Sequence, residues 1–195
     1  MIIGRLINKI NRQKRICLFK REVKDCGRLK NVGKDITIQH PDCVHIGNDV
    51  SIGDGTCFLP VKHYAGKNYS PSINFGDGCY IGKRNSFGSI VNINIGKNVL
   101  FAGEVHITDH SHGFEDINKP IIPQPLITKG GVTIEDDCWL GFASEILSGV
   151  HIGKHCVIAA RSVVVKDVPD YSIVAGNPAK VVKRYNFETE KWERV

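Results

Sequence analysis

The sequence predicts an all-β solenoid, and a six-residue repeat in residues 132–165 carries this prediction. Aliphatic residues recur there at strict intervals of six, and a small residue follows four positions after each of the first five. An α-helix would repeat its apolar residues every three or four positions, and an ordinary strand every two. In a solenoid, each aliphatic residue points inward and stacks on its equivalent one coil away. The aliphatic positions are Ile134, Leu140, Ile146, Ile152, Ile158 and Val164, and the small positions are Cys138, Ser144, Val150, Cys156 and Ser162.

Length and composition fit one soluble globular domain. The chain has 195 residues, 24% of them charged and 42% hydrophobic, and its 20 glycines suit a coil with many corners. No segment approaches the run of about 18 apolar residues that a membrane-spanning helix needs. The charged N-terminus also lacks the pattern of a secretory signal. We therefore expect a cytoplasmic protein, with the inner face of the membrane as an alternative location.

Cysteine usage indicates packing rather than disulfide or metal chemistry. The seven cysteines are odd in number and form no C-x-x-C pair. Cys79, Cys138 and Cys156 all fall in the small position of the repeat, where a thiol acts as a small hydrophobe. We expect no metal site.

Residues 1–34 form the first predicted region, a basic helical cap. They contain eleven Lys and Arg against two acidic residues, a net charge of +9 within a total of +6. Ile3, Leu6, Ile7 and Ile10 form an apolar stripe at helical spacing. A terminal helix that covers an open coil keeps a repeat protein soluble. The alternative is that residues 1–28 rest on an anionic membrane surface. Nucleic acid is disfavoured, because no stacking aromatic residues interleave with the basic ones.

Residues 35–185 form the second predicted region, the solenoid itself, and the repeat is interrupted in three places. Residues 58–72 contain prolines and no period, so they are predicted to form a loop. Near Ile93 the register shifts by two residues, which indicates a bulge at one corner. Residues 109–131 form a longer excursion, and such departures from a compact repeat are more often functional than idle. The polar tail, residues 186–195, is predicted to be a terminal helix or strand.

These motifs resemble those of a known family. The repeat [Ile/Leu/Val]-Gly-x-x-[small]-x, the block DDCWLG at 136–141 and the segment AGNPAKV at 175–181 are similar to the hexapeptide-repeat acyltransferases. The most similar group is the sugar and polysaccharide O-acetyltransferases, which includes galactoside and maltose acetyltransferases. The resemblance covers about residues 35–185. It implies a left-handed parallel β-helix of triangular cross-section, a homotrimer, and an acetyl-CoA site in the groove between neighbouring subunits.

The resemblance also implies roles for individual residues. His110, at the start of the excursion, corresponds to the histidine that acts as general base. Trp139 falls beside the cofactor groove, and the remaining expected cofactor-binding residues are Gly141, Ala160 and Lys166 along the pantetheine arm and Lys180 and Lys183 near the nucleotide phosphates.

General chemistry supports a histidine in this position. A sugar hydroxyl is a poor nucleophile at neutral pH, so a nearby imidazole that can accept its proton assists acyl transfer. We expect His112 and Asp109 to bind the acceptor; Asp109 could instead fix the tautomer of the neighbouring imidazole or start a turn.

The predicted activity is therefore O-acetylation of a sugar or of a surface-polysaccharide or glycolipid precursor. One alternative is N-acetylation of an amino sugar. A second is a gamma-type zinc carbonic anhydrase, because His106, His110 and His112 could be zinc ligands. A third is a non-catalytic β-helix scaffold.

Overall fold

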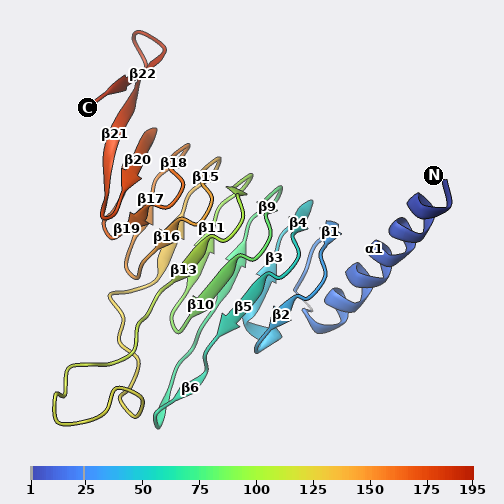
Figure 1. Ribbon diagram of the computed structural model, residues 1–195, viewed down its shortest axis with the longest axis horizontal. Coiled ribbons are helices and arrows are strands. Elements are labelled where there is room, and N and C mark those ends of the chain that lie inside the picture. Colours follow the sequence, from blue (N-terminus) through green and yellow to red (C-terminus); the bar gives the residue numbers. More distant parts are fainter. Residues whose placement is uncertain (1, 24) are drawn as a thin grey trace.

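Apart from two antiparallel hairpin segments, the chain forms three parallel sheets that it visits in a fixed, repeating order (Figure 1). The computed structural model describes residues 2–23 and 25–195, with side chains from residue 10 onward. The nine-stranded sheet contains β1 (Leu29–Val32), β4 (Val50–Ile52), β9 (Tyr80–Ile81), β12 (Leu100–Phe101), β15 (Trp139–Leu140), β18 (Val157–Ile158), β20 (Ser172–Gly176), β21 (Ala179–Asn186) and β22 (Lys191–Arg194). The six-stranded sheet contains β2 (Thr37–Ile38), β5 (Cys57–Pro60), β10 (Ser86–Ser89), β13 (His106–Thr108), β16 (Glu145–Ile146) and β19 (Val163–Val164). The five-stranded sheet contains β3 (Val44–Ile46), β8 (Ile73–Phe75), β11 (Ile93–Ile95), β14 (Val132–Ile134) and β17 (His151–Ile152).

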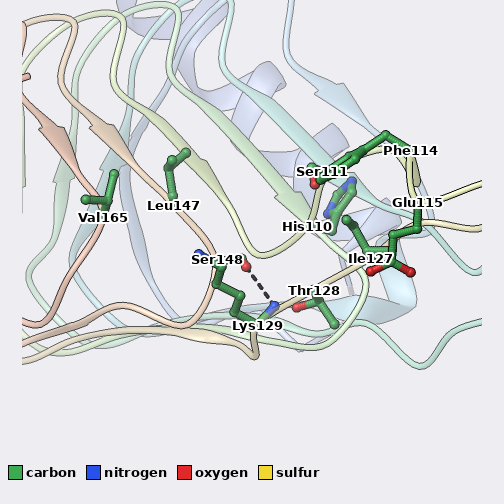
Figure 2. A pocket seen from close by; sticks show the side chains of 10 residues that line it. All are labelled: His110, Ser111, Phe114, Glu115, Ile127, Thr128, Lys129, Leu147, Ser148 and Val165. Atoms are coloured by element: carbon green, nitrogen blue, oxygen red, sulfur yellow. Dashed lines mark hydrogen bonds between the residues drawn. The ribbon is translucent and has the colours of Figure 1, made fainter. Parts of the chain in front are cut away.

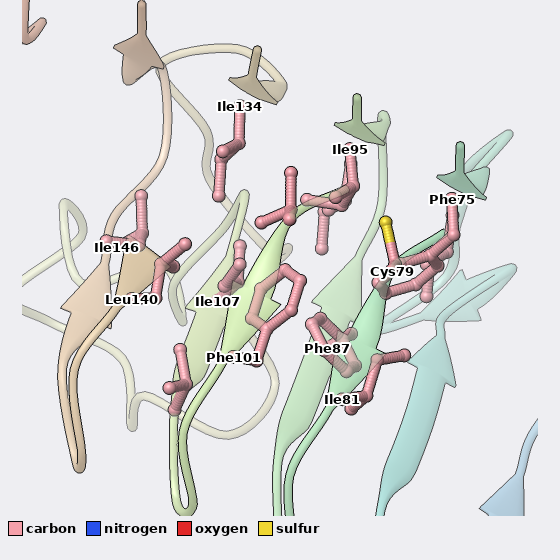
Figure 3. Packing of buried hydrophobic residues seen from close by; sticks show 14 of the residues in the cluster. Phe75, Cys79, Ile81, Phe87, Ile95, Phe101, Ile107, Ile134, Leu140 and Ile146 are labelled. Carbon is pink, nitrogen blue, oxygen red and sulfur yellow. The ribbon is translucent and has the colours of Figure 1, made fainter. Parts of the chain in front are cut away.

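The inward positions of the repeat stack from coil to coil, as the sequence predicts. Ile107 lies between Phe87 and Ile146 in the six-stranded sheet, and all three side chains are fully buried (Figure 3). Phe87 also stacks on Phe58, with ring centroids 5.6 Å apart. This column excludes water along the whole stack and is the main source of its stability.

The small inward positions are filled as expected. Cys79, Cys138 and Cys156 are buried free thiols. Burial raises the pKa of the Cys79 thiol to about 11, so this side chain stays protonated at neutral pH.

A single helix, α1 (Ile2–Glu22), precedes the stack. Its C-terminal end packs on the first coil, where Phe19 is buried against Phe58 with ring centroids 6.3 Å apart. The Arg15 guanidinium donates to the carbonyl of Val32 at 2.7 Å. The other end of the helix projects away from the sheets (Figure 1). The predicted stripe formed by Ile3, Leu6 and Ile7 involves side chains outside the described part of the chain.

Parallel pairing begins with the bridge between Cys26 and Ile46 and continues with Leu29 opposite Val50, so it starts ahead of residue 35, where the repeat is predicted to begin. At the other end, β20, β21 and β22 form an antiparallel hairpin ribbon, and the tail contributes β22. In the part of the chain that the structure describes, no helix is long and apolar enough to cross a membrane.

All three interruptions of the repeat lie at the same corner, between the six-stranded and five-stranded sheets. The hairpin of β6 (His63–Tyr64) and β7 (Lys67–Asn68) lies between β5 and β8, and the excursion lies between β13 and β14. The two-residue register shift lies between β10 and β11, because Phe87 and Ile95 are eight residues apart where Ile146 and Ile152 are six apart. Since coils stack directly, three insertions at one corner meet in space. The hairpin and the excursion protrude together at the bottom of Figure 1.

Candidate active site

Hydrogen bonds join the two limbs of the excursion to each other and join the excursion to the segment that contains the β6–β7 hairpin. Its two limbs pair at Ser111 and Ile127, whose backbone N–H groups each donate to the other's carbonyl at 2.9 Å. The backbone N–H of Leu126 donates to the Tyr69 hydroxyl at 2.9 Å. The Tyr64 hydroxyl donates to the carbonyl of Ile122 at 2.9 Å. The loop is therefore held by contacts across coils, although it has no repeat of its own.

Asp109 is completely buried at the base of this loop, and its carboxylate accepts hydrogen bonds from the corner of the preceding coil. The Ser89 hydroxyl and the Val91 N–H donate to Oδ2 at 2.7 and 2.9 Å. The Ile90 N–H donates to Oδ1 at 2.8 Å. These donors lie at the corner between β10 and β11, which contains the two extra residues. The corner with the register shift therefore supplies the hydrogen-bond donors that bind this carboxylate.

Asp109 also orients His110. The Nδ1 atom of His110 lies 3.0 Å from Oδ1 of Asp109, and the imidazole is 16% exposed. Because a carboxylate only accepts hydrogen bonds, Nδ1 carries the proton and Nε2 is left with a free lone pair. The ring rests over Gly88, where an added Cβ would stand 3.4 Å from Cε1. This arrangement can accept a proton at Nε2 from a bound hydroxyl.

His110 lies at one end of a cleft of about 500 Å³, a volume typical of small-molecule sites (Figure 2). The excursion supplies most of its lining. The other wall comes from residues that directly follow β16 and β19 in the six-stranded sheet. The excursion residues are Ser111, Phe114, Glu115, Ile127, Thr128 and Lys129, and the wall residues are Leu147, Ser148 and Val165.

The two residues expected to bind the acceptor lie outside this cleft. Asp109 has no exposed surface and sits beneath His110. His112 is exposed and packs edge-on against Tyr64, with ring centroids 5.4 Å apart. In their place the cleft presents Ser111 and Glu115. Sequence patterns could not identify these two, since the path of an aperiodic loop depends on what it packs against; their position inside the excursion was the available signal.

The residues expected to bind the cofactor also lie outside the cleft of the single chain. Trp139 is 49% exposed on the nine-stranded sheet. Gly141 is buried, and a Cβ there would stand 2.6 Å from the N atom of Ala160 on the next coil. Ala160 and Lys166 are exposed, Lys166 directly after the cleft residue Val165. Lys180 and Lys183 lie on β21, the first exposed and the second half-buried.

The three histidines considered as zinc ligands do not converge. Burial lowers the pKa of His106 on β13, with Glu145 opposing and His110 adding to the shift. His110 faces the cleft and His112 faces Tyr64. Among the described residues, no three His, Cys, Asp or Glu side chains form a group that could hold a metal ion.

Comparison with known proteins identifies a family model, a relative in Escherichia coli and two solved structures. Residues 131–166 match the family model described as bacterial transferase hexapeptide (six repeats). WbbJ of Escherichia coli (strain K12), provisionally named a lipopolysaccharide biosynthesis O-acetyl transferase, is 32% identical over 197 residues, which span 97% of this chain and 100% of WbbJ.

Two solved structures share the fold. A variant of AntD, an N-acyltransferase from Bacillus cereus in complex with dTDP-4-amino-4,6-dideoxyglucose and coenzyme A, aligns with a TM-score of 0.71 and 21% identity over 89% of this chain and 90% of that chain. The hexapeptide-repeat acetyltransferase VCA0836 of Vibrio cholerae O1 biovar eltor, in complex with acetyl coenzyme A, aligns with a TM-score of 0.57 and 24% identity over 94% of this chain and 85% of that chain. The coverage of WbbJ, together with the repeat match, shows that this chain belongs to the hexapeptide-repeat acyltransferases.

Proposed function

We propose that the protein transfers an acetyl group from acetyl-CoA to a hydroxyl of a sugar or of a surface-polysaccharide precursor, with His110 as general base. The observation that carries this proposal is the Asp109–His110 pair at the end of the cleft. A buried carboxylate that fixes the imidazole tautomer leaves a proton acceptor facing the space where an acceptor sugar would bind.

The proposed reaction is direct transfer. Nε2 of His110 takes the proton of the acceptor hydroxyl as its oxygen forms a bond to the thioester carbonyl carbon. The carbon–sulfur bond then breaks, and the departing CoA sulfur takes the proton back from the imidazolium. The products are an acetyl ester and free CoA thiol, and His110 returns to its neutral form. No acyl-enzyme is needed, because the thioester is already activated.

Relatives support the donor and the acceptor class. VCA0836 was solved with acetyl coenzyme A, and the name of WbbJ places an O-acetyl transferase in lipopolysaccharide biosynthesis. The second candidate is N-acetylation of an amino sugar, which the fold match to AntD favours, because that N-acyltransferase was solved with an amino sugar nucleotide.

We also propose a left-handed closed coil and a homotrimer. The fixed order in which the chain visits its three sheets supports a coil. Trp139 is exposed and is not among the residues that line the His110 cleft, and both observations support a donor site completed by a neighbouring subunit. The projecting basic helix supports contact of residues 1–28 with anionic lipid at the inner face of the membrane. Vesicle sedimentation of the chain with and without residues 1–28 tests this contact.

The experiment that tests the activity measures thiol release from acetyl-CoA with a panel of sugars, nucleotide sugars and amino sugars. We expect turnover on a hydroxyl acceptor that falls by about 10²–10⁴-fold in His110→Ala, because general-base catalysis contributes about this much. His45→Ala is the matched control, since His45 pairs with Asp25 on the five-stranded sheet. Turnover only on amino sugars would support the second candidate, and an active His110→Ala would contradict the proposed base.

A further inference from the structure

We propose that Phe114 and Glu115 form the acceptor subsite, and that it takes the ring of a neutral sugar with a hydroxyl next to the one that is acetylated. This inference rests on the proposed function and adds to it the residues that recognise the acceptor. It replaces Asp109 and His112 in that role, because neither lines the cleft.

The first observation is position. Phe114 and Glu115 line the same cleft as His110, on the side of the imidazole, whereas Lys129 reaches toward Leu147 at the other end (Figure 2). An acceptor held by Phe114 and Glu115 would therefore present its hydroxyl to the proposed base.

The second observation is exposure of an apolar ring in a polar setting. Phe114 is 62% exposed, whereas most of the surface of a phenylalanine side chain is normally buried. The C–H face of a pyranose ring can cover such an aromatic face while the hydroxyls at its edge stay free to form hydrogen bonds. An exposed aromatic ring beside a carboxylate can therefore bind both the apolar face and the hydroxyl edge of a sugar ring.

The third observation is that the backbone on both sides of Phe114 and Glu115 is held by contacts within the loop. The buried Gln124 accepts from the N–H of Asp116 at 3.1 Å and donates to the carbonyls of Asp116 and Lys119 at 3.0 and 3.1 Å. A Cβ on Gly113 would stand 2.2 Å from the carbonyl oxygen of Pro125, so the two limbs are in direct contact there. A pre-ordered loop loses little conformational entropy when it binds a ligand.

The fourth observation is charge. Glu115 forms no ion pair among the described side chains, whereas its neighbour Asp116 pairs with Lys119 at 2.9 Å. A carboxylate has two acceptor oxygens, and hydrogen bonds from two adjacent hydroxyls can satisfy both. It would repel a phosphate or a carboxylate group on the acceptor. The ring at this end of the cleft therefore carries no phosphate or carboxylate group, as in a neutral sugar.

The test uses steady-state kinetics with the hydroxyl acceptor identified by thiol release and with its deoxy analogue, which lacks the neighbouring hydroxyl. We expect Glu115→Gln to lower kcat/KM for the acceptor by about 10- to 100-fold, the range for a lost hydrogen bond to a charged group. The KM for acetyl-CoA should not change. Phe114→Ala should raise the KM for the acceptor, and Glu188→Gln, on the exposed C-terminal turn, is the matched control.

The deoxy analogue separates recognition from a general structural effect. The wild type should have a much lower kcat/KM for the deoxy analogue than for the acceptor. Glu115→Gln should have almost equal kcat/KM values for the two, because the substitution and the deoxy analogue each remove one partner of the same hydrogen bond. Discrimination by Glu115→Gln as strong as that of the wild type would overturn the subsite. So would loss of acceptor binding in Lys129→Met with unchanged Glu115→Gln, since that result would indicate an anionic acceptor. Turnover by the wild type with unaffected Glu115→Gln leaves the proposed function standing and rejects only the subsite; no turnover by the wild type rejects both.

Discussion

Asp109 shows at the scale of one residue how a buried charge is kept in this fold. Its carboxylate receives hydrogen bonds from one hydroxyl, two backbone N–H groups and the imidazole of His110. A buried charge without partners would be strongly destabilising, so the four donors are what permit it. The three donors from the preceding coil fix the carboxylate that binds Nδ1 of His110, and this leaves Nε2 of a cleft-lining imidazole free to accept a proton.

We predict that Asp109→Asn lowers both stability and activity. A carboxamide has one acceptor oxygen, so at least one buried donor loses its partner, and the free energy of unfolding should fall by about 1–3 kcal/mol. The kcat should also fall, because the imidazole loses the acceptor that fixes its tautomer. Urea unfolding and steady-state kinetics measure the two effects. Ser89→Ala removes only one of the donors, so it should lower the free energy of unfolding and the kcat by less than Asp109→Asn does. A wild-type kcat in Asp109→Asn would contradict the positioning role.

The excursion, residues 109–131, is the element that separates stability from function. It carries most of the cleft lining but contributes little to the stacked core, which consists of inward residues of the coils. Loosening it should therefore change acceptor binding while leaving the solenoid folded.

We predict that Gln124→Ala has this effect. The substitution removes the side-chain amide that joins the backbone of Asp116 to that of Lys119 and Pro120. Hydrogen exchange over residues 113–127 should become faster and the KM for the acceptor should rise, while the thermal midpoint stays close to that of the wild type. Gln39→Ala, at an exposed glutamine, is the control. Unchanged exchange in the excursion would show that Gln124 does not hold it.

At the scale of the whole molecule, the nine-stranded sheet carries an exposed apolar stripe. Tyr80, Leu100 and Trp139 lie side by side on β9, β12 and β15, and they are 55%, 41% and 49% exposed. Contiguous apolar residues on a sheet face are typical of a subunit interface. The stripe therefore supports the proposed trimer, in which a neighbouring subunit would complete the proposed donor site.

We predict that Leu100→Glu prevents assembly. A carboxylate at the centre of the stripe would have to be buried without a partner in the assembled protein, which is strongly unfavourable. Sedimentation velocity should show a trimer for the wild type and a monomer for Leu100→Glu, and the variant should bind acetyl-CoA more weakly. Lys191→Glu, on the C-terminal strand β22, should remain a trimer. A monomeric wild type, or a trimeric Leu100→Glu, would contradict this assembly.

The repeat, the inward column and the small buried positions can all be predicted from the sequence alone. These features follow from local periodicity, because residues six apart, such as Ile146 and Ile152, face the same interior wherever the coil runs. The sequence likewise places His110 in the excursion. Because the period is regular elsewhere, the sequence also shows where along the chain it is interrupted.

Which residues of those interruptions contact one another depends on how the coils stack, and so only the fold shows it. The hairpin, the register shift and the excursion share one corner, so Tyr64 meets Ile122 and Asp109 meets Val91 across coils. Such contacts depend on which residues stack one coil away, and no local pattern encodes them once the period is broken. For the same reason Asp109 became the support for the imidazole, and Glu115 lines the cleft where Asp109 and His112 were expected.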